Sequence, residues 1–293
     1  VAGGCFNITN ARHSIVAGGH RNIIQSPTNE CCSRGATISG GVGHNSSGGT
    51  LNATTGDLTR AITCCNAGAF STIAGGLRNI GTGAASTVSG GRSNTASNSY
   101  STVGGGYYND ATATTSTVGG GYGNTASGNS STVSGGDSNT ASSSYSTVGG
   151  GCGNTASNWY STVDGGYSNI ASSWYSTVGG GSNSTACGSS STVGGGKTNT
   201  ASGHYSTVGG GCNNTASSSF STVGGGSNNT ASGYGSTIGG GGSWSSGNTA
   251  SGFLGSTVGG GNQNTSSNSY STVGGGNNNT ASGARSTISG GGN

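Results

Sequence analysis

The stretch Ser116-Thr-Val-Gly-Gly-Gly-Tyr-Gly-Asn124-Thr-Ala-Ser-Gly-Asn-Ser130 is one complete unit of the repeat that decides the fold of this chain. Its Ser-Thr pair recurs every 15 residues from Ser71 to Ser236. The pair returns at Ser256 after a five-residue insertion and then keeps its period to the end of the chain. A strict short period is typical of a solenoid, in which each repeat forms one coil stacked on the next.

Each coil is predicted to contain two short strands joined by two turns. We number the unit from its Ser, so that the strands cover positions 1–3 and 9–12. Because side chains alternate across a strand, Val at position 3 and Ala at position 11 point inward with Ser at 1 and Asn at 9. Thr at positions 2 and 10 points outward. The sequence therefore predicts an all-β, parallel β-solenoid of about eighteen coils with a thin core.

Two repeated residue types have structural explanations. Glycines at positions 4–6 allow the chain to reverse with positive φ and let neighbouring coils approach closely. Asn at position 9 suits a ladder of side-chain amides hydrogen-bonded from coil to coil, and Asn also tolerates the left-handed region beside a turn. We expect both features to hold the fold rather than to bind a ligand.

The chain is expected to have two regions, 1–70 with irregular coils and 71–293 with the regular repeat. Each of two inserted loops in the first region ends in a cysteine pair, Cys31-Cys32 and Cys64-Cys65. Stacked coils bring these pairs together as a candidate disulfide cluster of undetermined connectivity, and bonds to another chain are the alternative. Metal binding is disfavoured because adjacent cysteines lack the two-residue spacer of zinc sites.

The other cysteines have no predicted partner in their own chain. Cys5, Cys152 and Cys212 share position 7, and the last two lie four coils apart, about 19 Å at the spacing of β-strands. That distance exceeds the reach of a disulfide, so these thiols are free or meet another chain. Cys187 replaces a Ser at position 12. Cysteines in a polar, glycine-rich chain favour an oxidising, extracellular setting.

Two outward rows are candidate binding surfaces. Aromatic residues recur at positions 14 and 15, where they either stack on each other and cover the turn or bind a sugar or partner surface. The aromatic row comprises Tyr145, Trp159, Tyr160, Trp174, Tyr175, Tyr205 and Phe220. The Thr row comprises Thr87, Thr102, Thr117, Thr132 and Thr147. A regular Thr row suits ordering of water against ice, and a second such row at position 10 is expected on the opposite face.

Composition argues against chemistry and against several partner classes. Charged residues make up only 4% of the chain, and its basic residues form no run that would bind nucleic acid or an anionic membrane. No apolar stretch approaches the length of about 20 residues that crosses a bilayer. The few acids and histidines form no metal spacing or Ser/His/Asp grouping, so we expect no catalytic residue, metal or cofactor.

The segment Asn124 to Gly136, Asn-Thr-Ala-Ser-Gly-x-x-Ser-Thr-Val-x-Gly-Gly, resembles the head repeats of YadA-like trimeric autotransporter adhesins and similar repeats of phage and virus tail fibres. The resemblance covers most of the chain from Ser71 onward. It implies a left-handed β-roll in which three chains pack along one axis. The period of 15 is longer than the fourteen typical of the adhesin heads, and the numerous cysteines also fit a viral or eukaryotic extracellular fibre.

These observations predict a non-enzymatic, structural or adhesive fibre segment outside the cell, on a cell surface or on a virion. It would assemble with itself, either side by side as a trimer or head to tail, because both termini fall inside a repeat and uncapped ends expose strand edges. Its other partner would be a cell-surface glycan or matrix. The alternatives are an ice-binding protein that uses the Thr row and a glycan-binding adhesin that uses the aromatic row.

Overall fold

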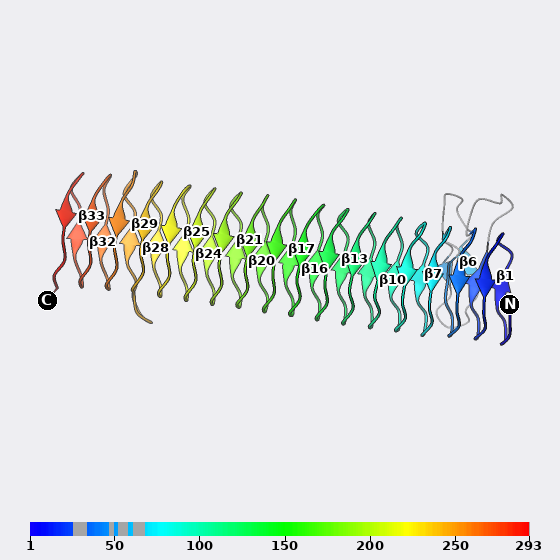
Figure 1. Cartoon of the computed structure of the whole chain (residues 1–293). Helices are drawn as coiled ribbons and strands as arrows, with labels where there is room; N and C mark the ends of the chain where they lie inside the picture. Colours follow the sequence, from blue (N-terminus) through cyan, green and yellow to red (C-terminus); the bar gives the residue numbers. More distant parts are fainter. Residues whose placement is uncertain (26–33, 47–49, 52–57, 61–67, 293) are drawn as a thin grey trace. The chain divides into compact units, whose positions relative to one another are not determined.

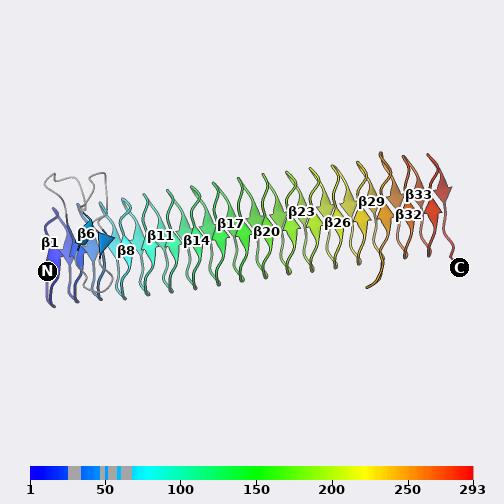
Figure 2. The same ribbon diagram turned by 180° about the vertical axis from the view of Figure 1, so that it is seen from behind.

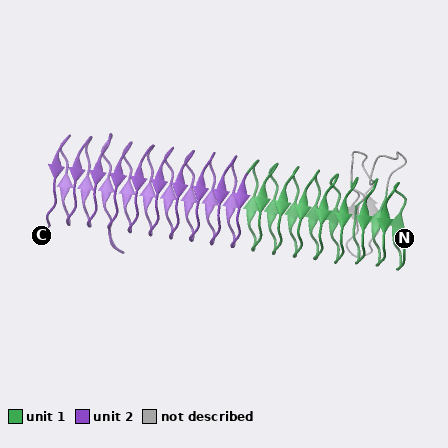
Figure 3. Ribbon diagram, viewed as in Figure 1, with its two compact units in different colours: residues 1–145 green, residues 146–293 purple. Residues whose placement is uncertain are grey.

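The structure is a computed structural model that describes residues 1–25, 34–46, 50–51, 58–60 and 68–292. Nearly all of its strands are two residues long, and no helix occurs in the described part. The chain divides into two compact units, Val1–Tyr145 and Ser146–Asn293 (Figure 3). Each unit is a parallel β-solenoid, and the described residues make about 17 turns in all, which confirms the predicted fold class.

In the first unit, strands of successive turns pair in parallel within two sheets (Figure 1). The first sheet contains β2 (Ile15–Val16), β4 (Thr37–Ile38), β7 (Thr72–Ile73), β9 (Thr87–Val88), β11 (Thr102–Val103), β13 (Thr117–Val118) and β15 (Thr132–Val133). The second contains β1 (Ile8–Thr9), β3 (Ile23–Ile24), β8 (Ile80–Gly81), β10 (Thr95–Ala96), β12 (Asp110–Ala111), β14 (Thr125–Ala126) and β16 (Thr140–Ala141), and Asn45 connects β3 to β8 by one bridge to Ile23 and one to Ile80. An antiparallel pair, β5 (Thr50–Leu51) and β6 (Leu58–Arg60), lies outside both sheets.

The second unit repeats this arrangement (Figure 2). Its first sheet contains β17 (Thr147–Val148), β19 (Thr162–Val163), β21 (Thr177–Val178), β23 (Thr192–Val193), β25 (Thr207–Val208), β27 (Thr222–Val223), β29 (Thr237–Ile238), β31 (Thr257–Val258), β33 (Thr272–Val273) and β35 (Thr287–Ile288). Its second contains β18 (Thr155–Ala156), β20 (Ile170–Ala171), β22 (Thr185–Ala186), β24 (Thr200–Ala201), β26 (Thr215–Ala216), β28 (Thr230–Ala231), β30 (Thr249–Ala250), β32 (Thr265–Ser266) and β34 (Thr280–Ala281).

The interior of each turn is as small as the repeat predicts. Val103 pairs with Val118 across neighbouring turns, and Ala111 pairs with Ala126 in the opposite sheet; all four are fully buried. Ser at position 1 and Asn at position 9 are buried beside them, as at Ser116. Each turn therefore buries one branched side chain, one methyl group and two polar groups that need hydrogen-bond partners.

In the second sheet, the Asn ladder supplies these partners for the side chains at position 9, whereas the buried hydroxyls of Ser86, Ser191, Ser206 and Ser236 at position 1 have none among the described residues. In Asn109, Nδ2 donates to the carbonyl of Gly105 in its own turn (2.9 Å) and to that of Gly121 in the next turn (2.8 Å). Its Oδ1 accepts the backbone N–H of Asn124 (3.0 Å). The predicted ladder is present, although it links each amide mainly to backbone rather than to the neighbouring amide. One side chain thus fixes a turn and ties it to the next.

Positive φ angles fall where the backbone reverses. Gly106 at position 6 has φ 89°, and a Cβ there would collide with the carbonyl oxygen of Gly121 in the next turn. Position 6 therefore requires glycine for both reasons. In the same turn φ is also positive at Gly105 in position 5 (142°) and at Tyr108 in position 8 (56°), and not at the position-9 Asn as the sequence had suggested.

The break in the period near residue 240 is two insertions, not one as expected. Asn248 donates to the carbonyl of Gly240, eight residues back, where a regular ladder Asn reaches four residues back. Four extra residues therefore lie in this turn and project as the loop between β29 and β30 (Figure 1). The Ser256 hydroxyl accepts from the N–H of Gly252, four residues earlier, whereas the regular spacing is three. The fifth extra residue lies in the other turn of this coil, at positions 12–15. Asn248 and Ser256 therefore both keep their interior positions.

Candidate binding surfaces

The turns at positions 12–15 form the aromatic edge of the solenoid. The turn that presents Tyr160 is closed by Ser161, whose hydroxyl donates to the carbonyl of Asn158 (2.6 Å) and accepts the N–H of the same residue (3.1 Å). Tyr160 itself has φ 56°. A non-glycine residue with positive φ is uncommon, and a bulky one more so. The same conformation occurs at every aromatic residue of position 15, so the fold holds these rings outward in a strained backbone.

The aromatic row contains stacked pairs of rings. The rings of Tyr160 and Tyr175 are 5.1 Å apart and nearly parallel, at 4°. Beside them the rings of Trp159 and Trp174 stack at 5.8 Å. Further along, Tyr205 and Phe220 stack at 5.2 Å. Tyr145 is exposed at the end of the first unit. Parallel stacking leaves no room for a sugar between two rings and presents only their edges and outer faces.

The two Thr rows lie on different sheets. Thr102 and Thr117 pair in register in the first sheet, as do Thr117 and Thr132, so position 2 forms the expected row, which is partly exposed. Position 10 forms the row of the second sheet, where Asp110 interrupts it. Burial raises the pKa of Asp110 above its ordinary value, and a hydrogen bond from Thr95 opposes this shift. Each face therefore carries a row one Thr wide.

A second group of rings, not singled out from the sequence, lies at the turns of positions 4–8. Tyr107 is 5.5 Å from Tyr122 in the next turn and 4.2 Å from its neighbour Tyr108. The guanidinium of Arg92 lies 5.1 Å from the centre of the Tyr107 ring. The sequence contained a sign of this group, because Arg92, Tyr107 and Tyr122 share position 7 of the repeat. It is hard to recognise because the residue type at this position changes from coil to coil.

The four cysteines of the candidate disulfide cluster, Cys31, Cys32, Cys64 and Cys65, lie outside the described residues. Cys5, Cys152, Cys187 and Cys212 are described, and none of them forms a disulfide there. Cys152 and Cys212, which both lie in the second unit, are partly exposed, while Cys5 and Cys187 are exposed. These four thiols are accessible to a reagent or to another chain.

One histidine takes the place of a ladder Asn. His44 is fully buried, its backbone N–H donates to Oδ1 of Asn22 (3.1 Å), and its imidazole Nδ1 accepts the backbone N–H of Asn79 (3.1 Å). Burial lowers the pKa of His44, and contacts with the backbone of Asn79, Gly76 and Gly40 oppose that shift. The neutral imidazole therefore takes the place of the Asn side chain as a hydrogen-bond acceptor in the ladder. Among the described residues, no cluster of three metal-binding side chains occurs.

Comparison with known proteins matches this repeat to surface adhesins. The family model of the ubiquitous surface protein adhesin repeat matches residues 131–142, which contain β15 and β16. The match confirms the resemblance seen in the sequence, over part of one unit of the repeat. A search of curated proteins found no match. In the part that the structure describes, no helix is long and apolar enough to cross a membrane.

Proposed function

We propose that this chain is a non-enzymatic segment of an adhesive fibre exposed on a cell or virion surface. The observation that carries the proposal is the adhesin-repeat match at residues 131–142 within a solenoid whose turns share one register. In such a solenoid each outward-facing position of the repeat forms a row of side chains. The same weak contact can therefore be made many times along the solenoid. Repetition raises overall avidity without any new kind of contact.

The fibre is proposed to assemble from copies of this chain. One turn buries little more than a Val, an Ala and two polar side chains, as at Val103 and Ala111. Packing of three solenoids side by side would bury further surface, and the adhesin resemblance supports this arrangement. Head-to-tail growth is the alternative assembly. The cysteine pairs of region 1–70 and the accessible Cys152 and Cys212 are proposed as covalent links within or between copies.

Two measurements test the proposal. The native mass should correspond to three copies of the 27.6 kDa chain, whereas head-to-tail growth would give a broad series of larger particles. Labelled native protein should bind to cells or to extracellular matrix and lose binding when the chains are separated. A monomer that adheres equally well would refute the assembly, and absence of adhesion to all surfaces would refute the adhesive function.

Ice binding is a second candidate because Thr102, Thr117 and Thr132 are held in register in one sheet. A thermal-hysteresis measurement discriminates it from adhesion. Hysteresis that disappears in Thr102→Leu and Thr117→Leu variants would favour ice binding. No hysteresis at millimolar protein would exclude it.

A further inference from the structure

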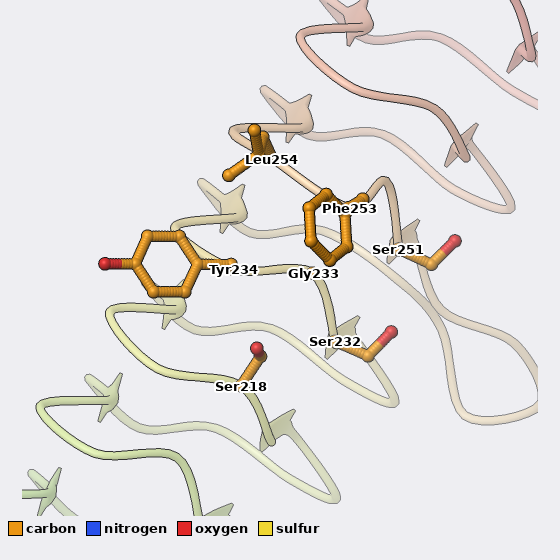
Figure 4. A pocket seen from close by; sticks show the side chains of 7 residues that line it. All are labelled: Ser218, Ser232, Gly233, Tyr234, Ser251, Phe253 and Leu254. Atoms are coloured by element: carbon orange, nitrogen blue, oxygen red, sulfur yellow. The ribbon is translucent and has the colours of Figure 1, made fainter.

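A hollow of about 560 Å³ opens on the aromatic edge where the turn is one residue longer than elsewhere (Figure 4). It lies within the second unit. The hollow is lined by Ser218, Ser232, Gly233, Tyr234, Ser251, Phe253 and Leu254. Its size falls in the range of small-molecule sites, roughly 300–1,000 Å³.

The extra residue adds a ring beside the hollow, while the ring of Tyr234 meets that of Phe220 edge to face at 5.4 Å. Leu254 keeps the register of the repeat, because it pairs with Tyr234 and the next N–H, that of Gly255, donates to the carbonyl of Tyr234 (2.9 Å). Phe253 is therefore the residue that the turn has gained. Its side chain is 80% exposed, against 48% for Tyr234. In Figure 4 the two rings stand apart with Gly233 between them, unlike the parallel pairs elsewhere on this edge.

Gly233 leaves this part of the hollow without a side chain. Gly233 is buried, and a Cβ there would collide with the carbonyl oxygen of Gly252 in the next turn. The repeat accepts Asn or Ser at the same position in other turns, as at Asn158 and Ser173. Glycine at 233 thus maintains both the close backbone approach and the open space between the rings.

The chemistry of the lining is apolar on one side and hydroxylic on the other. In this fully described part of the chain, the hydroxyls of Ser218, Ser232 and Ser251 make no hydrogen bond to protein, and Ser232 and Ser251 are exposed. No Lys, Arg, His, Asp or Glu lines the hollow. A charged ligand would find no counter-charge here. A neutral ligand with an apolar face and several hydroxyls matches both sides.

We propose that this hollow binds a neutral pyranose unit of a surface glycan. The C–H face of the sugar would lie on the ring of Phe253 or Tyr234, and its hydroxyls would exchange hydrogen bonds with Ser232 and Ser251. This sugar site rests on the proposed adhesive function, for which it specifies the class of ligand bound at the hollow. It differs from binding along the stacked row, where the rings already occupy each other's faces.

The test uses the full chain in its native assembly. Saturation-transfer NMR is recorded with methyl glycosides of neutral hexoses and, separately, with a sialylated and a sulfated sugar. We expect saturation of a neutral hexose, and a loss of affinity of about tenfold or more in Phe253→Ser and Tyr234→Ser, because tenfold corresponds to only about 1.4 kcal/mol of lost contact. Trp244→Ser is the matched control, since Trp244 is 90% exposed in the longer loop outside the hollow.

Several outcomes would overturn the inference. They are no saturation by any neutral sugar, unchanged affinity in both ring variants with native circular dichroism, and preference for the acidic sugars or for an apolar peptide. If the protein adheres to cells but binds no neutral sugar, the inference fails while the proposed function stands. If it adheres to nothing and yet binds the hexose through Phe253, the fibre proposal fails and the sugar site stands.

Discussion

The Oδ1 atom of Asn169 accepts the backbone N–H of Ser184 at 2.9 Å, and at Ser184 the Asn ladder of the second unit is interrupted. The shorter Ser side chain accepts the N–H of Asn199 at 3.3 Å but does not reach the glycine carbonyls of positions 5 and 6. Ser184→Asn should restore those two hydrogen bonds. At about 1 kcal/mol for each buried bond, we expect stabilisation of roughly 1–2 kcal/mol in urea denaturation.

The reverse change provides the control for the ladder. Asn199 donates to Gly195 (2.8 Å) and Gly211 (2.9 Å), so Asn199→Ser should destabilise by a similar amount. A Ser184→Asn variant no more stable than the parent, together with a harmless Asn199→Ser, would show that the ladder contributes nothing beyond the strand hydrogen bonds.

His44 should make stability depend on pH below neutrality. Burial lowers the pKa of its imidazole, so between its unfolded pKa, near 6.5, and its lower folded pKa the unfolded chain binds more protons than the folded one. The stability is fully present above pH 6.5 and is lost as pH falls from there. His44→Asn, which restores the usual ladder residue, should flatten the dependence of the denaturation midpoint between pH 7.5 and 5. An equally steep dependence in His44→Asn and in the parent would contradict this account.

The sequence predicted the parts of the fold that repeat. A Val every 15 residues at Val103 and Val118, with Ala111 and Ala126 half a coil away, left one arrangement of side chains that buries both columns. What it did not reveal depends on local geometry. A count of five extra residues does not say which turn contains them, so the exposure of Phe253 was not predictable. A tyrosine at position 15 likewise gives no sign of a positive φ, because bulky residues avoid that region.

The positive φ of Tyr160 predicts an unusual order of stability among its variants. Both Tyr160→Ala and Tyr160→Gly lose the stacking on Tyr175, but only glycine adopts φ 56° without strain. We expect the Gly variant to be more stable than the Ala variant by about 1 kcal/mol. Trp159, which precedes it and lacks positive φ, should show the opposite order, with Trp159→Ala the more stable. Thermal denaturation of the four proteins decides, and Ala above Gly at both positions would contradict the backbone argument.

The division of the extra residues between two turns predicts which deletions the solenoid tolerates. Removal of residues 243–246 shortens the longer loop to the regular length and leaves Gly247, a residue suited to positive φ, at position 8 directly before Asn248. The amide of Asn248 would then still reach Gly240 and Gly261, which it contacts at 2.9 Å, so we expect a folded protein of nearly unchanged stability.

Removal of one residue more, 243–247, shifts the chain by one position. Thr249 would then take the interior place of Asn248, and Ala250 would turn outward, because a one-residue slip exchanges the two faces of a strand. We expect the coils after β29 to lose protection in amide hydrogen exchange, while the coils of β17 to β27 keep theirs. Equal protection in the two deletion variants would mean that the five residues form one insertion after all and that the one-residue bulge at Phe253 is not fixed by the ladder.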